Sequence, residues 1–166
     1  MENRKRLSIK EANDAYEEQY RYGLAVDVCP RLEKAYRLLL PYLEDENPEA
    51  LILFASVVAE MEEYMPDAVS EQDRRTVAST LQDLLEGRLS VETEPYRRYA
   101  SESLALLAVR YLCGTGVAQS VRMAKRCYEK SYQMGFTLAK LPLEMLFYTS
   151  DDGKLCYRLG NIVLSE

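Results

Sequence analysis

Apolar residues recur at helical spacing along most of the chain, and the strict alternation typical of strands is missing. The pattern predicts seven helices, most of them bounded by a capping residue, a glycine or a proline. The expected ranges are about 8–22, 30–43, 48–58, 70–86, 96–113, 120–134 and 138–148. Two interpretations stay open for the tail after Gly153, a short capping helix or an irregular segment.

Local signals refine these boundaries. Ser8 and Glu11 have the spacing of a capping box, which places the start of the first helix at Ser8. Asn47 precedes a proline and is expected to cap the third helix. Pro41 lies inside the second pattern, where it should kink or end the helix because the bond to the carbonyl four residues earlier is lost.

Short connections between helices favour antiparallel hairpins, and some features of one hairpin recur in another. A tyrosine, a glycine and two alanines follow in the same order, with the alanines fifteen residues apart in both copies. They are Tyr20, Gly23, Ala35 and Ala50 in the first copy, and Tyr111, Gly114, Ala124 and Ala139 in the second.

The segment from Ser103 to Ala139 carries the fullest set of such residues. Its matching positions are Leu107, Ala108 and Tyr111, then Gly114, Gly116 and Val117, then Ala124, Tyr128, Ser131 and Gly135. This pattern resembles a Sel-one-like repeat (SLR), a branch of the tetratricopeptide-type solenoids. The departures are Cys127 for a tryptophan, Tyr132 for a small residue and Ser120 for an aspartate cap. The resemblance implies an all-α fold, a short right-handed α-solenoid of antiparallel hairpins with about three repeats and a C-terminal capping segment.

On this reading residues 1–166 form a single helical-repeat domain. Residues 8–49 are a degenerate repeat, and residues 50–102 are a divergent repeat with an insertion. Residues 103–138 are the best-matching repeat. Residues 139–166 are a partial repeat and cap, opened by Ala139. In such arrays small residues at helix crossings let each hairpin bury its face on the next.

Composition agrees with a folded protein, since 48% of the 166 residues are hydrophobic and 29% are charged. No secretory leader is visible near the start. The longest apolar run, 50–59, is too short to span a bilayer. We therefore expect a cytoplasmic protein without membrane contact.

Residue chemistry argues against catalysis. The chain has no histidine, which removes the Ser-His-Asp and Cys-His arrangements. Its four cysteines form no Cys-x-x-Cys pair, so a structural zinc site is not expected. Reduced, mostly buried thiols are the favoured state, and a disulfide framework is the alternative. We expect no metal, no cofactor and no enzymatic activity.

Charge is unevenly distributed within a net charge of −6. The segment 38–73 has ten acidic residues and no lysine or arginine, whereas 97–130 has seven basic and two acidic residues. Such runs are either solvated faces or a means of steering a charged partner. The acidic residues are Glu44, Asp45, Glu46, Glu49, Glu60, Glu62, Glu63, Asp67, Glu71 and Asp73.

The leading hypothesis is a non-enzymatic protein–protein interaction module (a scaffold, adaptor or regulator), as the repeat resemblance implies. It would bind a partner protein through the groove lined by the first helix of each hairpin and through its charged faces. The alternative is an inhibitor whose acidic face, 44–73, blocks a nucleic-acid-binding site of a target enzyme. Direct nucleic-acid binding is not expected of an acidic chain, and homodimerisation stays open. The candidate partner-binding residues are Glu18, Arg21, Tyr22, Glu60, Glu62, Glu63, Tyr64, Arg98 and Arg110.

Overall fold

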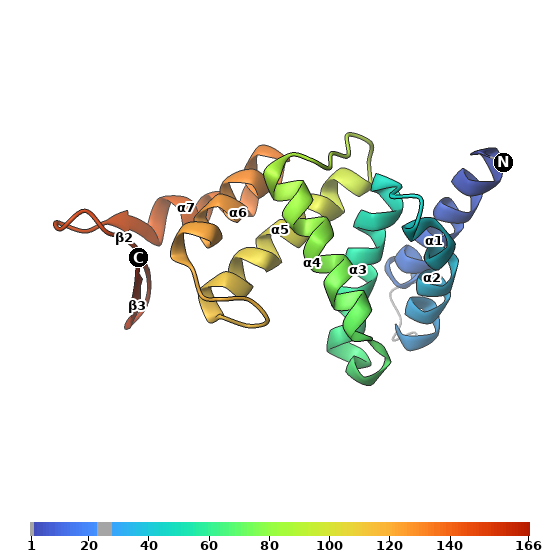
Figure 1. Ribbon diagram of the computed structural model, residues 1–166, viewed down its shortest axis with the longest axis horizontal. Coiled ribbons are helices and arrows are strands. Elements are labelled where there is room, and N and C mark those ends of the chain that lie inside the picture. Colours follow the sequence, from blue (N-terminus) through green and yellow to red (C-terminus); the bar gives the residue numbers. More distant parts are fainter. Residues whose placement is uncertain (1, 23–27) are drawn as a thin grey trace. The chain divides into compact units, whose positions relative to one another are not determined.

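The computed structural model describes the backbone of residues 2–22 and 28–166, and the side chains of 8–18 and 28–166. The described chain is mostly helical and ends in one small sheet (Figure 1). It divides into two compact units, Met1–Asp83 with Leu89–Val91, and Leu84–Arg88 with Glu92–Glu166. The helices are α1 (Glu2–Tyr22), α2 (Val28–Leu43), α3 (Pro48–Tyr64), α4 (Glu71–Glu86), α5 (Tyr96–Cys113), α6 (Val121–Gln133) and α7 (Lys140–Met145).

Three helices pack in sequence order in the first unit, α1 on α2 and α2 on α3. The apolar residues Leu32, Ala35 and Leu39 recur at helical spacing along α2, and all three are buried. α3 is buried on nearly all sides from Ala50 to Val58, as an apolar run of this length requires. The helical stripes in the sequence therefore gave the core of this unit.

The start of α3 follows the predicted capping chemistry, and α4 has a capping box that the sequence analysis did not predict. The Asn47 side chain accepts a hydrogen bond from the N–H of Ala50 at 3.0 Å. Before α4, the Ser70 hydroxyl accepts from the N–H of Asp73, whose carboxylate accepts from the N–H of Ser70. This reciprocal pair is a capping box with aspartate in the third helical position.

The start predicted for α1 is wrong. Ser8 lies inside a helix that already begins at Glu2, so Ser8 and Glu11 do not cap it. Residues 2–7 contain good helix formers, which extend the helix past the local signal. α2 also begins earlier than expected, at Val28, and continues past Pro41 to Leu43. The predicted end of α1 at Gly23, and the match of 23–26 to the later turn, lie outside the described residues.

In the second unit α5 and α6 form the hairpin that the sequence predicts. Gly114 ends α5 in the left-handed conformation, with φ +70°, which favours glycine. Ser120 caps α6 by accepting from the N–H of Met123. Ala124 is fully buried, and the buried Ser131 hydroxyl donates to the carbonyl of Ser101 on α5 at 2.6 Å.

The small residues therefore lie inside this hairpin, as predicted. Two residues at helical spacing with buried ones are nevertheless exposed, Ala78 of α4 and Tyr132 of α6. Tyr132 lies in the last turn of its helix and is 42% exposed.

The C-terminal segment corrects the all-α prediction. The helix expected at 138–148 is only the short α7, which follows a 3₁₀ turn at Thr137–Ala139. Neither open interpretation of the tail is right. The chain forms an antiparallel sheet in the order β1 (Phe147–Thr149), β2 (Leu155–Leu159) and β3 (Ile162–Ser165).

Aromatic packing anchors this sheet on the second unit. The Phe147 ring of β1 lies 5.1 Å from the Tyr157 ring of β2 and 6.1 Å from the Tyr128 ring of α6, measured between centroids. Phe147 and Tyr157 are directly opposite each other in the register. Edge contacts of this kind stabilise a cross-strand pair beyond simple burial. Phe147 therefore closes the core with a strand, where the repeat pattern predicted a helix.

Candidate functional site

The predicted partner-binding residues are divided between the two units. Glu18 lies on α1, and Glu60, Glu62, Glu63 and Tyr64 lie on the last two turns of α3, all in the first unit. Arg98 and Arg110 lie on α5 in the second unit. The side chains of Arg21 and Tyr22 lie outside the described residues.

Glu60 forms an internal ion pair. Its Oε2 accepts from Nη2 of Arg31 at 2.6 Å, and Arg31 is almost fully buried at 4% exposure. The same guanidinium donates to the carbonyl of Tyr16 and lies 5.4 Å from the centre of the Tyr16 ring. One cation on α2 thus links α1 to α3. Glu60 stabilises the unit by neutralising that cation.

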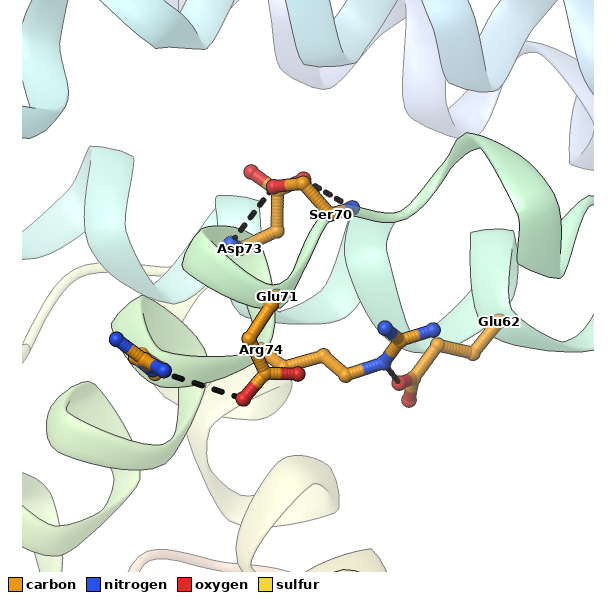
Figure 2. A network of polar contacts seen from close by, with 6 residues as sticks. Glu62, Ser70, Glu71, Asp73 and Arg74 are labelled. Carbon is orange, nitrogen blue, oxygen red and sulfur yellow. Dashed lines mark hydrogen bonds and ion pairs between the residues drawn. The ribbon is translucent and has the colours of Figure 1, made fainter.

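Three more of the acidic residues form hydrogen bonds or ion pairs near the start of α4 (Figure 2). Glu62 accepts from Nε of Arg74 at 3.1 Å, which links α3 to α4. Asp73 is buried, closes the capping box, and accepts from the Tyr36 hydroxyl at 3.1 Å. Glu71 pairs with Arg75 one turn later at 3.5 Å.

Part of the acidic segment 38–73 is therefore engaged in contacts within the unit and does not form an open acidic surface. Carboxylates of Glu60, Glu62 and Asp73 have partners from elsewhere in the unit. Exposed carboxylates remain at Glu63, beside the half-exposed ring of Tyr64, and at Asp67 in the 3₁₀ turn Pro66–Ala68. A second exposed group, 44–46, lies in the turn between α2 and α3.

The second unit presents a different surface on α5. Five exposed residues follow one line along this helix, and all its other residues are buried or half-buried. At 3.6 residues per turn, the five directions fall within about 80° of one another. We call this line the α5 stripe, formed by Arg98, Glu102, Leu106, Val109 and Cys113.

The centre of the α5 stripe is apolar and its N-terminal end is charged. Leu106 is 55% exposed and Val109 is 45% exposed. Arg98 places its guanidinium 5.2 Å from the centre of the Tyr99 ring. Partial burial raises the pKa of Glu102; Arg98 opposes this shift and the Glu94 carboxylate adds to it. An apolar centre with a charged end is typical of a protein-contact surface.

Sequence reasoning found Arg98 and the flanking Arg110 but missed the rest of the α5 stripe. The spacing of four, four, three and four residues was visible in the sequence. However, Leu104, Leu107 and Leu112 lie on the same helix and look equally apolar, yet they are buried. The pattern alone does not show which side of such a helix faces water.

The described side chains include no cluster of candidate metal ligands. Within 8–18 and 28–166, no three Cys, Asp or Glu side chains gather as a metal site would require. All four cysteines are free thiols, with Cys127 and Cys156 buried and Cys113 exposed. Burial raises the pKa of the Cys127 thiol to about 12, which makes it a poor nucleophile at neutral pH. No helix in the described ranges has the length and hydrophobicity needed to cross a membrane.

No family model, curated protein or solved structure matches the chain.

Proposed function

We propose that the chain is a non-enzymatic protein-interaction module of the SLR type, a short right-handed solenoid of about three hairpins. The α5–α6 hairpin supports this, because its glycine cap, buried alanine and buried serine occupy the positions of the repeat pattern. In the repeat reading α5 is the first helix of its hairpin, and first helices line the binding groove.

The α5 stripe is the observation that carries the proposal. Leu106 and Val109 are exposed one turn apart at the centre of this stripe, which gives a partner an apolar surface to contact. The partner would place an apolar side chain against these two residues. The charged end formed by Arg98 and Glu102 would favour a partner of complementary charge.

The test compares the proteins that co-purify from the native host with three immobilised chains. These are the wild type, Leu106→Asp/Val109→Asp, and Leu40→Asp as a matched control on an exposed leucine of α2. We expect one partner at fixed stoichiometry on the wild type and the control, with at least about tenfold weaker binding to the double variant. Circular dichroism confirms that each chain is folded. Equal binding to all three chains would contradict the proposal.

The acidic-inhibitor hypothesis receives less support. It needs a continuous acidic face, but Glu60, Glu62 and Asp73 are held by Arg31, Arg74 and Ser70.

A further inference from the structure

The outer edge of β3 exposes backbone groups that can pair with another strand. Leu155 and Glu166 exchange both of their backbone hydrogen bonds at 3.1 and 2.9 Å. Bonded and non-bonded pairs alternate along an antiparallel ladder. The register pairs Ser165 with Cys156 and Val163 with Arg158, which makes both of these non-bonded pairs.

The N–H and C=O groups of Val163 and Ser165 therefore point away from β2. The hydrogen bonds between β2 and β1 support this alternation of bonded and non-bonded pairs. The N–H of Arg158 donates to the carbonyl of Leu146, so it points toward β1 and away from β3. The sheet has the order β1-β2-β3, so β3 is an edge strand within the part of the chain that the structure describes. Four backbone groups are left for a partner strand.

This edge is held in place by contacts at both ends of the strand. At one end, Leu159 and Ile162 are paired across a two-residue turn in which Gly160 has φ +58°. At the other end, Oε2 of Glu166 accepts from the Ser120 hydroxyl at 2.7 Å and from the N–H of Arg122 at 3.1 Å. The carboxylate thus lies at the positive end of α6. A strand fixed in this way loses little conformational entropy when it pairs.

The side chains of the strand suit a second copy of itself. Residues 159–165 read Leu-Gly-Asn-Ile-Val-Leu-Ser, without a charge or a proline in a chain of net charge −6. Ile162 is 59% exposed and Val163 is 48% exposed. Edges that avoid pairing usually carry lysine, proline or a bulge, and these are missing here. Two such strands can meet without repulsion between like charges.

We propose that the chain forms a two-fold symmetric homodimer by antiparallel pairing of β3 with β3 of a second copy. The register follows from the outward groups. Val163 of each copy pairs with Ser165 of the other, which satisfies all four groups on each edge within the bounds of β3. Leu164 then faces Leu164 of the second copy across the axis. The two sheets join into one of six strands.

The first test is the mass in solution, by light scattering after size exclusion. A standard interface buries about 800 Å² per partner, and two four-residue strands bury less than this. We therefore expect a dissociation constant of roughly 10–300 µM for the dimer. Val163→Pro removes an outward N–H without touching the ladder to β2, and Val163→Lys adds an edge charge. We expect dimers of the wild type and monomers of both variants. Leu141→Lys on α7 is the control, because it removes a 61% exposed leucine away from the edge and should remain dimeric.

The second test is a cross-link that reports the register. In a Cys113→Ser background, Leu164→Cys should form an intermolecular disulfide, because a facing non-bonded pair has its Cα atoms about 4.5 Å apart. Asn161→Cys in the same background should not, because its two copies would be about 20 Å apart along the strands. A monomeric wild type at the highest concentration, or a dimer lost in Leu141→Lys and kept in Val163→Pro, would overturn the proposal.

Discussion

The contacts of Arg31 predict that this one side chain holds the first three helices together. Replacing Arg31 with methionine keeps much of the apolar stem but removes the guanidinium. The carboxylate of Glu60 then loses a partner at 2.6 Å and the carbonyl of Tyr16 loses its side-chain donor. Removing one partner of a buried pair costs about 3–5 kcal/mol. Because the side chain of Glu60 is 21% exposed, water replaces part of the lost interaction, and we expect about 3 kcal/mol.

A double variant separates the ion pair from other effects of the substitution. Arg31→Met/Glu60→Leu removes both charges, and replacement of a whole buried pair by apolar side chains is often neutral. We expect its free energy of unfolding to fall within about 1 kcal/mol of the wild type. The single variant would then be less stable than the double variant, although it carries fewer changes.

Hydrogen exchange measured by mass spectrometry suits this chain, because its two compact units supply an internal control. Peptides from α2 and α3 should exchange faster in Arg31→Met and recover in the double variant. Peptides from α5 and α6 should not change. A single variant as protected as the wild type, or a double variant less protected than the single one, would refute the role of the pair.

Two further predictions concern the second unit. Ala124→Glu places a charge at a fully buried position between α5 and α6, so we expect a loss of about 4 kcal/mol or more in a urea titration; an unchanged midpoint would refute the packing. Iodoacetamide at pH 8 should label exposed Cys113 in the native state and Cys127 only after unfolding, as read by peptide mass spectrometry. Because burial raises the pKa of Cys127 to about 12, the neutral thiol supports folding below the unfolded pKa, and this contribution is lost as pH rises from about 9 to 12. Labelling of Cys127 in the native state at pH 8 would contradict the burial of this thiol.

The long helices could be predicted because their signals are local. The cap residues Asn47 and Ser120 mark the starts of α3 and α6, and the glycine after Cys113 marks the end of α5. The predicted end of the third helix at Val58 is wrong, because α3 continues to Tyr64. The start predicted at Ser8 is wrong because the residue spacing of a capping box also occurs inside a helix, where the preceding residues favour helix formation. Local chemistry marks a helix end only when nothing upstream continues the helix.

The sheet was missed although a signal was present. Gly160-Asn161 is a dipeptide typical of a two-residue hairpin, and it separates Tyr157 from the β-branched pair Ile162 and Val163. Because of the repeat resemblance, the predicted helix extended through Phe147. This removed the first strand with which the tail could have been predicted to pair. The α5 stripe could not be predicted for a related reason, because the exposure of each residue on α5 depends on which neighbouring segments cover the helix.

The acidic segment shows why charge counts in a sequence do not define an interface. Glu60 and Glu62 lie in a segment without lysine or arginine, yet Arg31 and Arg74 pair with them from neighbouring helices. Reversing either charge would therefore disturb packing and mimic a binding defect. Glu63 lies next in the chain, and its side chain is exposed. Glu63→Lys is the substitution that separates the two effects: an acidic contact predicts weaker partner binding with unchanged stability, whereas a partner held by the α5 stripe binds this variant as well as the wild type.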